Sequence, residues 1–271
     1  MIGTFGPFVL ERIEGTGGPP VNIKATKTPY QDGSSYVDAQ LEDRPLSIYG
    51  FIKAGNQQVM YDLRRELAKI LNPKLGPGKL VYTNDSRSYV INAIAEESPV
   101  FNERYVSNQM FIINMVALDP YWRDENQTVK GLKFETGGMS FPLTLPMKFA
   151  EAAYKGNFYN SGDDDTPVEI QYKGPALNPV VFNETTGEYI KINYDLTADD
   201  VFYISTERGN KRLEVVNTDG TRRNVLNYID LGSTFFQLRP GQNILRYGSD
   251  HDSDQQAADV TVYWHNRYVG V

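Results

Sequence analysis

The sequence lacks cysteine altogether and contains only two histidines among its 271 residues. The absence of cysteine excludes disulfides, thiolate metal sites and a cysteine nucleophile. It also suits synthesis in a reducing cytoplasm, where disulfides are rare. The chain has no run of about 18 apolar residues, so no membrane-spanning helix is expected. Its first seven residues lack the basic segment and apolar core of a secretory signal, so no such signal is expected.

A basic excess is also missing, since 27 Lys and Arg stand against 34 Asp and Glu, a net charge of −7. Residues 1–131 hold 14 Lys and Arg against 15 Asp and Glu, and residues 132–271 hold 13 against 19. Proteins that bind nucleic acid gain affinity mainly by neutralising phosphates. Anionic membranes repel an acidic surface. We therefore expect neither a specific nucleic acid nor a membrane as partner.

Aromatic residues and turn formers are abundant instead, with 18 Tyr, 13 Phe, 23 Gly and 15 Pro. This combination is typical of many short strands and predicts a mainly β protein. The strands expected in the first half are Phe8–Leu10, Leu46–Ile52, Lys79–Tyr82, Tyr89–Ile94 and Asn108–Leu118. The rest of residues 1–30 is interpreted as a loop, because Gly and Pro cluster at positions 15–20.

One helix is predicted, from about Gln57 to Leu71. Asn56 is placed to cap its first turn. The dipeptide Asn72-Pro73 ends it, because a residue before proline avoids the helical region. We expect one apolar stripe of this helix to pack against a sheet, and its members are Val59, Leu63, Leu67, Ile70 and Leu71.

The helix and its neighbouring strands predict an α+β domain over residues 1–130. The boundary is placed in the polar segment Arg123–Lys130, and Gly137–Leu143 is interpreted as a connector. Residues 131–271 show short apolar runs separated by turn signals and no convincing helix, which predicts an antiparallel β-sandwich. Its last strand is expected over Asp259–Val271, with Val260, Val262 and Trp264 on one face.

Two acidic clusters raise the question of a metal site. A calcium loop of the EF-hand type beginning at Asp250 and continuing through Asp252 and Asp254 needs Gly in its sixth position and Glu in its twelfth. Those positions hold Gln255 and Thr261, so the match fails, and only a looser calcium site stays open there. The second cluster, Asp163–Asp165, has three adjacent carboxylates, a pattern typical of a hydrated loop. We expect no metal at either cluster.

No catalytic pattern accompanies the two histidines. His251 lies within the first acidic cluster, and no serine is surrounded by a nucleophile motif. His265 follows Trp264 on a predicted strand, where we expect a structural role. The sequence therefore predicts no enzyme, no catalytic residue and no cofactor.

An interaction protein is the interpretation that remains from composition. The surplus of Tyr and Phe fits either interfaces, in which aromatic residues are enriched, or ordinary sheet core. A carbohydrate-binding protein would need an exposed aromatic platform. The one candidate cluster for it is Tyr154, Phe158 and Tyr159, which the alternation of residues along a strand explains equally well.

Short segments of a recognisable kind follow one another along nearly the whole chain. In the first half they are Gly50–Ile52, Leu63–Leu67, Leu71–Pro73, Gly78–Tyr82 and Asp119–Trp122. In the second half they are Gly138–Leu145, Gly174–Pro179, Asn183–Glu188, Ile229–Ser233 and Leu238–Asn243. In their order and combination these segments resemble the phage tail family that contains the distal tail proteins of siphophages.

The resemblance implies a ring-forming N-terminal domain and a galectin-like C-terminal sandwich. Members of this family form six-fold rings at the distal end of the tail in the virion. Such a ring joins the tail tube protein to the tail-associated, fibre-like protein and acts as a hub for receptor-binding proteins. The implied partners are therefore further copies of the chain and these three proteins. The alternative is a carbohydrate-binding adhesin of the tail tip that recognises sugars of the host cell wall.

Overall fold

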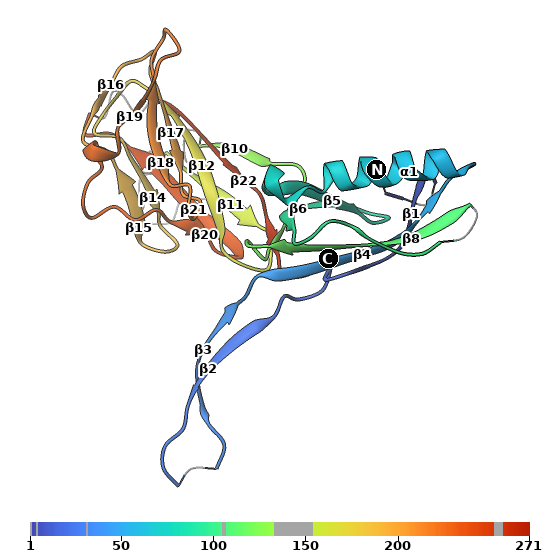
Figure 1. Cartoon of the computed structure of the whole chain (residues 1–271). Helices are drawn as coiled ribbons and strands as arrows, with labels where there is room; N and C mark the ends of the chain where they lie inside the picture. Colours follow the sequence, from blue (N-terminus) through green and yellow to red (C-terminus); the bar gives the residue numbers. More distant parts are fainter. Residues whose placement is uncertain (1, 4, 31, 105–106, 133–153, 252–256) are drawn as a thin grey trace, which may run out of the picture. The chain divides into compact units, whose positions relative to one another are not determined.

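The computed structural model describes residues 2–3, 5–30, 32–104, 107–132, 154–251 and 257–271. The chain divides into two compact units, of which unit 1 is Met1–Glu125 with Tyr268–Val271 and unit 2 is Asn126–Arg267 (Figure 1). Antiparallel strands make up most of both units, which confirms the mainly β prediction. In the described part of the chain, no helix has the length and apolar character that crossing a membrane requires.

Unit 1 is built on an eight-stranded sheet. Its main order is β1 (Phe8–Glu14), β4 (Arg44–Lys53), β8 (Asn108–Ala117), β6 (Ser88–Ala95), β9 (Trp122–Asp124) and β23 (Arg267–Tyr268), while β5 (Gly78–Thr83) pairs with β6 and β7 (Val100–Arg104) pairs with β8. Burial alternates along the two central strands, so Ile48 of β4 and Ile113 of β8 face the core as register partners. The five strands predicted for this region are confirmed, whereas β7 and β9 were not predicted.

Helix α1 spans Gln57–Ile70 and packs on this sheet through the core of unit 1. The Asn56 side chain accepts a hydrogen bond from the Val59 amide at 2.9 Å, which confirms the predicted cap. The helix ends at Ile70 with Leu71 as its C-cap, and a short 3-10 turn, η1 (Pro73–Leu75), follows. The predicted bounds are therefore confirmed.

The face that α1 buries differs from the predicted stripe. Met60 and Leu67 are its buried residues, with Leu63 and Leu71 packed beside them, whereas Val59 is 41% exposed and Ile70 is 61% exposed. Met60 was left out of the stripe although it lies seven residues before Leu67, close to two helical turns. The core-facing side is therefore centred on Met60 and Leu67, and two of the predicted members lie at its margin.

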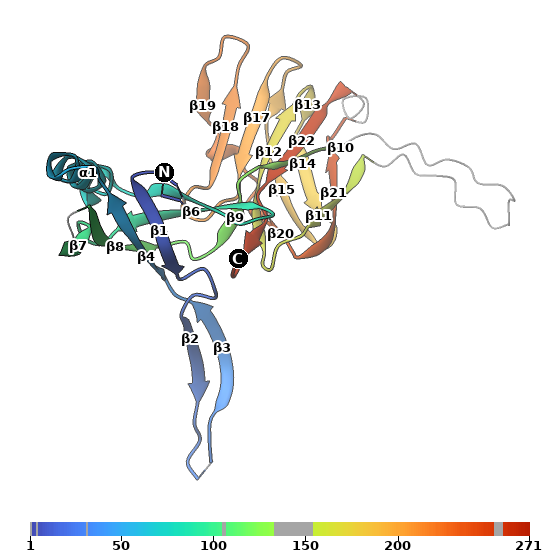
Figure 2. The same cartoon turned by 90° about the vertical axis from the view of Figure 1, so that its right-hand side faces the viewer.

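Between β1 and β4 the chain forms a two-stranded sheet of its own, made of β2 (Val21–Thr26) and β3 (Ser35–Leu41). We call this hairpin the arm; it is the blue pair of strands that extends away from the sheet of unit 1 in Figure 2. All of β2 is exposed, and in β3 only Leu41 is half-buried. The interpretation of Val21–Thr26 as part of a loop is therefore wrong, and β3 was not predicted.

Unit 2 is a β-sandwich with one core, as predicted. A seven-stranded sheet has the order β10 (Thr128–Leu132), β22 (Asp259–Trp264), β12 (Thr166–Lys173), β17 (Val201–Ser205), β18 (Arg212–Val216) and β19 (Arg222–Asn224), with β20 (Gln237–Leu238) beside β12. A four-stranded sheet has the order β11 (Lys155–Asn160), β21 (Gly241–Gly248), β14 (Val180–Asn183) and β15 (Glu188–Lys191). A short pair, β13 (Ala176–Leu177) with β16 (Asp195–Leu196), and a 3-10 turn, η2 (Leu226–Tyr228), complete the described part of the unit.

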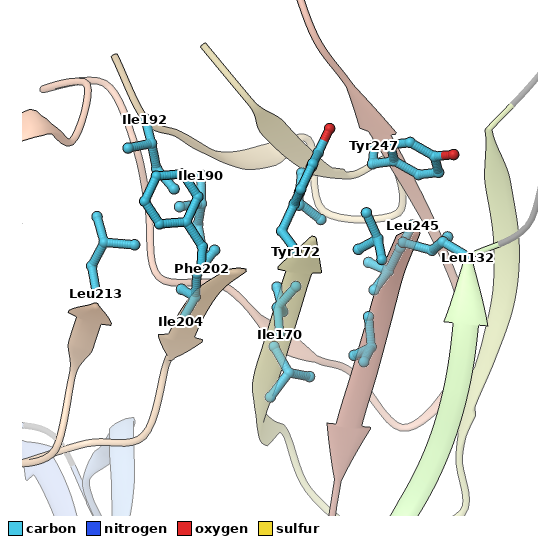
Figure 3. Packing of buried hydrophobic residues seen from close by; sticks show 14 of the residues in the cluster. Leu132, Ile170, Tyr172, Ile190, Ile192, Phe202, Ile204, Leu213, Leu245 and Tyr247 are labelled. Carbon is cyan, nitrogen blue, oxygen red and sulfur yellow. The ribbon is translucent and has the colours of Figure 1, made fainter. Parts of the chain in front are cut away.

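Side chains from both sheets meet in the core of unit 2. Tyr172 of the seven-stranded sheet meets Tyr247 of the four-stranded sheet edge-on, with 5.8 Å between their ring centroids, and both are labelled in Figure 3 among the side chains of this core. Burial raises the pKa of Tyr247 to about 12, so its hydroxyl stays neutral. The likeness of this sandwich to galectins stays a prediction.

The end of the chain leaves unit 2. Val260, Val262 and Trp264 of β22 are buried on one face, as predicted, but the strand stops at Trp264. The chain then continues into β23, which carries Tyr268 into the core of unit 1. The earlier passage of the chain from unit 1 to unit 2 lies between Glu125 and Asn126. The predicted connector at 137–143 lies outside the described residues.

Candidate functional site

Asp250, the first residue of the first acidic cluster, bonds to two distant segments of the chain. The Asp250 carboxylate accepts hydrogen bonds from the Asn178 side chain at 2.7 Å and from Lys191 Nζ at 3.2 Å. These two bonds lower the pKa of Asp250. His251, next to it, is exposed, whereas Asp252 and Asp254 lie outside the described residues. Asp250 therefore links the segment after β21 to Asn178, between β13 and β14, and to Lys191 at the end of β15.

The second acidic cluster is also part of the framework. The Asn160 side chain donates to the carbonyl of Asp164 at 2.9 Å, and the amide of Asp163 donates to the carbonyl of Arg267 at 2.7 Å. Burial, followed by the neighbouring Asp164 charge, raises the pKa of Asp165. Among the described residues, no group of three or more His, Asp or Glu is arranged to hold a metal ion.

The aromatic cluster considered for sugar binding does not form one platform. Phe158 is fully buried and meets Trp264 edge-on at 5.7 Å between ring centroids. Tyr154 is buried against Tyr247, with 5.2 Å between their centroids. Tyr159, which points to the other side of β11, is 66% exposed. Strand alternation therefore accounts for Phe158 and Tyr159.

The arm belongs to unit 1, but none of its residues is part of the core of that unit. Directly opposite residues of antiparallel strands share a face of the sheet. One face of the arm consists of the pairs Val21–Leu41, Ile23–Ala39 and Ala25–Tyr36. The other consists of the pairs Asn22–Gln40, Lys24–Asp38 and Thr26–Ser35. The arm is thus an amphipathic ribbon with one entirely apolar face.

That apolar face is exposed to solvent. Ile23 is 64% exposed, Tyr36 is 69% exposed, and Val37, which a bulge adds to β3, is 57% exposed. A two-stranded hairpin is at best marginally stable in water without further packing. Exposed apolar patches on an otherwise well-packed protein commonly indicate an interaction surface. The arm is therefore a candidate site of assembly.

Arg44 fixes the root of the arm. It is completely buried at the start of β4, just after the arm returns to the sheet. Its guanidinium donates to the carbonyls of Pro120, Gly15 and Val269, each at 2.6 Å, and to that of Gly17. The guanidinium carbon also lies 5.9 Å from the Trp122 ring centroid. One side chain therefore ties both ends of the arm to β9 and to the returning end of the chain.

The sequence contained a signal for the arm. The segment Val21–Thr26 alternates apolar and polar residues, and Ala39 and Leu41 continue the alternation on the return strand. This period of two is the pattern of a strand with one apolar face. The Gly and Pro residues before Val21 led to its interpretation as loop. Nothing in the sequence pointed to Arg44, because its role depends on carbonyls that are distant along the chain.

Comparison with known proteins gives two family matches. Residues 1–117 match the phage tail protein RIFT-related domain, and residues 161–268 match the C-terminal domain of a siphovirus-type tail component. No curated protein sequence matches the chain.

Solved structures match over nearly the whole chain. One match is the crystal structure of the SPP1 Dit protein, which is described as a paradigm of the hub adsorption apparatus in phages that infect Gram-positive bacteria. It aligns with a TM-score of 0.70 at 12% sequence identity, and the alignment covers 96% of this chain and 93% of that one. Structures of the phage P2 baseplate in its activated conformation, with Ca and with Sr, align with TM-scores of 0.59 and 0.53, each at 12% identity. They cover 99% and 96% of this chain and 93% and 91% of theirs.

The likeness in structure, at this low identity, establishes the fold. The family matches establish more, because they cover both units in the order that the sequence resemblance implied and leave out only residues 118–160 and 269–271. The chain therefore belongs to the siphovirus-type phage tail proteins, as a structural component of the tail.

Proposed function

We propose that this tail component forms a ring of six copies at the distal end of the tail tube and acts there as a hub. The ring joins the tube protein to the tail-associated, fibre-like protein and carries receptor-binding proteins. The observation that carries the proposal is the arm, since its apolar face, with Ile23 and Tyr36, is exposed on the described part of unit 1. The likeness to SPP1 Dit and to the P2 baseplate supports the assignment to this position.

The distribution of charge supports a division of work between the units. Unit 1 holds 13 Lys and Arg against 15 Asp and Glu, and unit 2 holds 14 against 19. Like-charged neighbours repel, so the more acidic unit 2 is suited to an outward, spread placement and the nearly balanced unit 1 to ring contacts. A ring at this position lets DNA pass during ejection, and the absence of a basic excess suits that passage.

The protein has no catalytic part in this proposal. Within the described residues, Asp250 and Asp164 of the two acidic clusters take part in bonds that hold turns together. These bonds give Asp250 and Asp164 a structural role. A wall hydrolase would clear host cell walls in a zymogram, and we expect no clearing from this chain.

Binding to the tube protein of the same phage tests the proposal. The full chain and the purified tube protein are mixed, and sedimentation velocity is measured for each alone and for the mixture. We expect a fast-sedimenting complex that contains the tube protein together with several copies of this chain. A chain that binds neither the tube protein nor the fibre-like protein at high concentration would contradict the hub role.

A further inference from the structure

We propose that the edge strand β19 of unit 2 binds an extended, acidic segment of another tail protein, which adds to the seven-stranded sheet as a further strand. The inference rests on the proposed hub role for the presence of that partner, and it names a contact that the hub role leaves open. Three properties of β19 carry it: an open backbone edge, two exposed arginines, and exposed apolar side chains beside them.

The backbone of β19 is open on one side. In the described part of the chain, β19 is the outermost strand of its sheet and pairs with β18 (Figure 2). The carbonyl of Thr221 and the amide of Val225 form hydrogen bonds with the β18 side of the hairpin, at 3.1 Å and 2.9 Å. Alternate residues of an antiparallel strand direct their backbone groups to the same side, so Arg222 and Asn224 direct theirs away from β18. An added strand can bond these groups.

The two arginines give this edge a positive charge on both faces. The side chain of Arg222 is 60% exposed and lies 3.4 Å from the Glu214 carboxylate. Arg223, which faces the other way, is exposed and donates to the Tyr194 hydroxyl at 2.6 Å. Residues 207–225 hold five Lys and Arg against three Asp and Glu, although unit 2 as a whole holds 14 against 19. An acidic unit thus carries a basic edge, which favours an acidic partner.

Exposed apolar side chains adjoin the arginines. Tyr194 meets Tyr228 edge-on, with 5.3 Å between their ring centroids. Tyr228 and Leu226 of η2 are each 40% exposed. Tyr and Arg are enriched at protein interfaces, particularly among the residues that contribute most to binding. An extended peptide on β19 would therefore gain side-chain contacts here in addition to its backbone hydrogen bonds.

The charge of β19 argues against a second copy as the occupant. Two copies that paired through this strand would bring Arg222 and Arg223 close to the same arginines of the other copy. Like charges directly opposite each other destabilise a pair of strands, and charged side chains at a sheet edge suppress pairing with apolar strands. An acidic strand is attracted instead, because its carboxylates pair with the arginines. The edge therefore selects a partner of opposite charge.

A short capped peptide in which glutamate and valine alternate tests the inference on the full chain. The amide signals of the protein are followed by nuclear magnetic resonance as the peptide is added. We expect the largest shifts at Arg222 and Asn224, together with slower hydrogen exchange of their amides, because these amides gain acceptors on the peptide. Two control peptides, one with lysine in place of glutamate and one N-methylated along its backbone, should bind at least about tenfold more weakly.

Charge reversal isolates the contribution of the two arginines. Arg222→Glu combined with Arg223→Glu should weaken binding of the acidic peptide by about tenfold or more, because attraction becomes repulsion. The matched control, Lys155→Glu combined with Arg208→Glu, makes the same change in net charge at exposed positions outside β19 and should leave binding within about twofold. Both variants should melt within a few degrees of the wild type, since all four side chains are exposed.

The outcomes separate this inference from the hub role. No binding of the acidic peptide, equal binding of either control peptide, or shifts centred away from β19 would each overturn the inference. The variant with Arg222→Glu and Arg223→Glu should still bind the tube protein, because the open edge of β19 takes a different partner. A chain that binds the acidic peptide but no tube protein would contradict the hub role and leave the peptide site standing.

Discussion

Replacing Arg44 with methionine is expected to loosen unit 1 and the root of its arm together. The change keeps most of the aliphatic volume and removes the donors to Gly15, Gly17, Pro120 and Val269. Burial lowers the pKa of Arg44, but an arginine pKa starts so high that the side chain remains charged at neutral pH. Four carbonyls that now bond a charged donor would lose it in the variant.

The size of the effect follows from two opposing contributions. A hydrogen bond from a charged group contributes roughly 1.5–3 kcal/mol, so four contribute roughly 6–12 kcal/mol. Burial of the charge costs several kcal/mol, and the methionine variant no longer carries that cost. We expect a net loss of about 3 kcal/mol in the free energy of unfolding of unit 1. For a unit of this size that loss corresponds to a fall in melting temperature of about 10 °C.

Calorimetry measures the melting temperature, and hydrogen exchange locates the change. We expect faster exchange of the Glu42 amide, which bonds Pro20 at the base of the arm, and of the Val271 amide, which bonds Thr16. Arg12→Met is the matched control, because Arg12 lies exposed on β1 and pairs with Glu14. A fall of less than about 2 °C for Arg44→Met would refute the role of Arg44 in holding the arm.

Three further predictions concern the returning end of the chain, the acidic clusters and calcium. The Tyr268 ring lies in the core of unit 1, with 5.4 Å between its centroid and that of Tyr89, so Tyr268→Ala should lower the free energy of unfolding by about 3–5 kcal/mol in a denaturant titration. Tyr268→Phe loses only the hydrogen bond to Asp124 and should lower it by about 1 kcal/mol. Equal losses for the two variants would contradict this packing. The raised pKa of Asp165 means that the folded state binds more protons between the ordinary and the raised value, so stability falls as pH rises through that window. Asp165→Asn should therefore melt higher than the wild type at about pH 7, with the difference vanishing below about pH 3.9, and a lower melting temperature at neutral pH would contradict it. Added calcium should leave the melting temperature unchanged, and a rise of several degrees would reveal a site, since a ligand stabilises the state that it binds.

The elements that the sequence predicted best are those whose own core fixes their pattern. Strands β4 and β8 and the buried face of β22 follow the alternation of apolar residues, because each packs one side on its core. The ends of α1 were predicted from Asn56 and Pro73, because capping and proline sterics act within a few residues.

What escaped prediction depends on contacts that are distant along the chain or outside it. Arg44 looks like an ordinary surface residue until Val269, 225 positions away, is placed beside it. Tyr268 looks like the continuation of the last strand of unit 2, although it belongs to the core of unit 1. The arm has no core of its own. The alternation of apolar and polar residues in Val21–Thr26 was therefore given less weight than the Gly and Pro residues that precede it, which are typical of a loop. The aromatic cluster could not be resolved either, because alternation predicts which residues differ in burial and not which side faces the core.

Imaging of the purified full chain by negative-stain electron microscopy tests the central claim most directly. We expect closed rings of uniform size at high concentration, or on mixing with the tube protein, with class averages of six-fold symmetry. A chain that stays monomeric in both conditions, or that forms open filaments with no closed ring, would contradict the proposed ring.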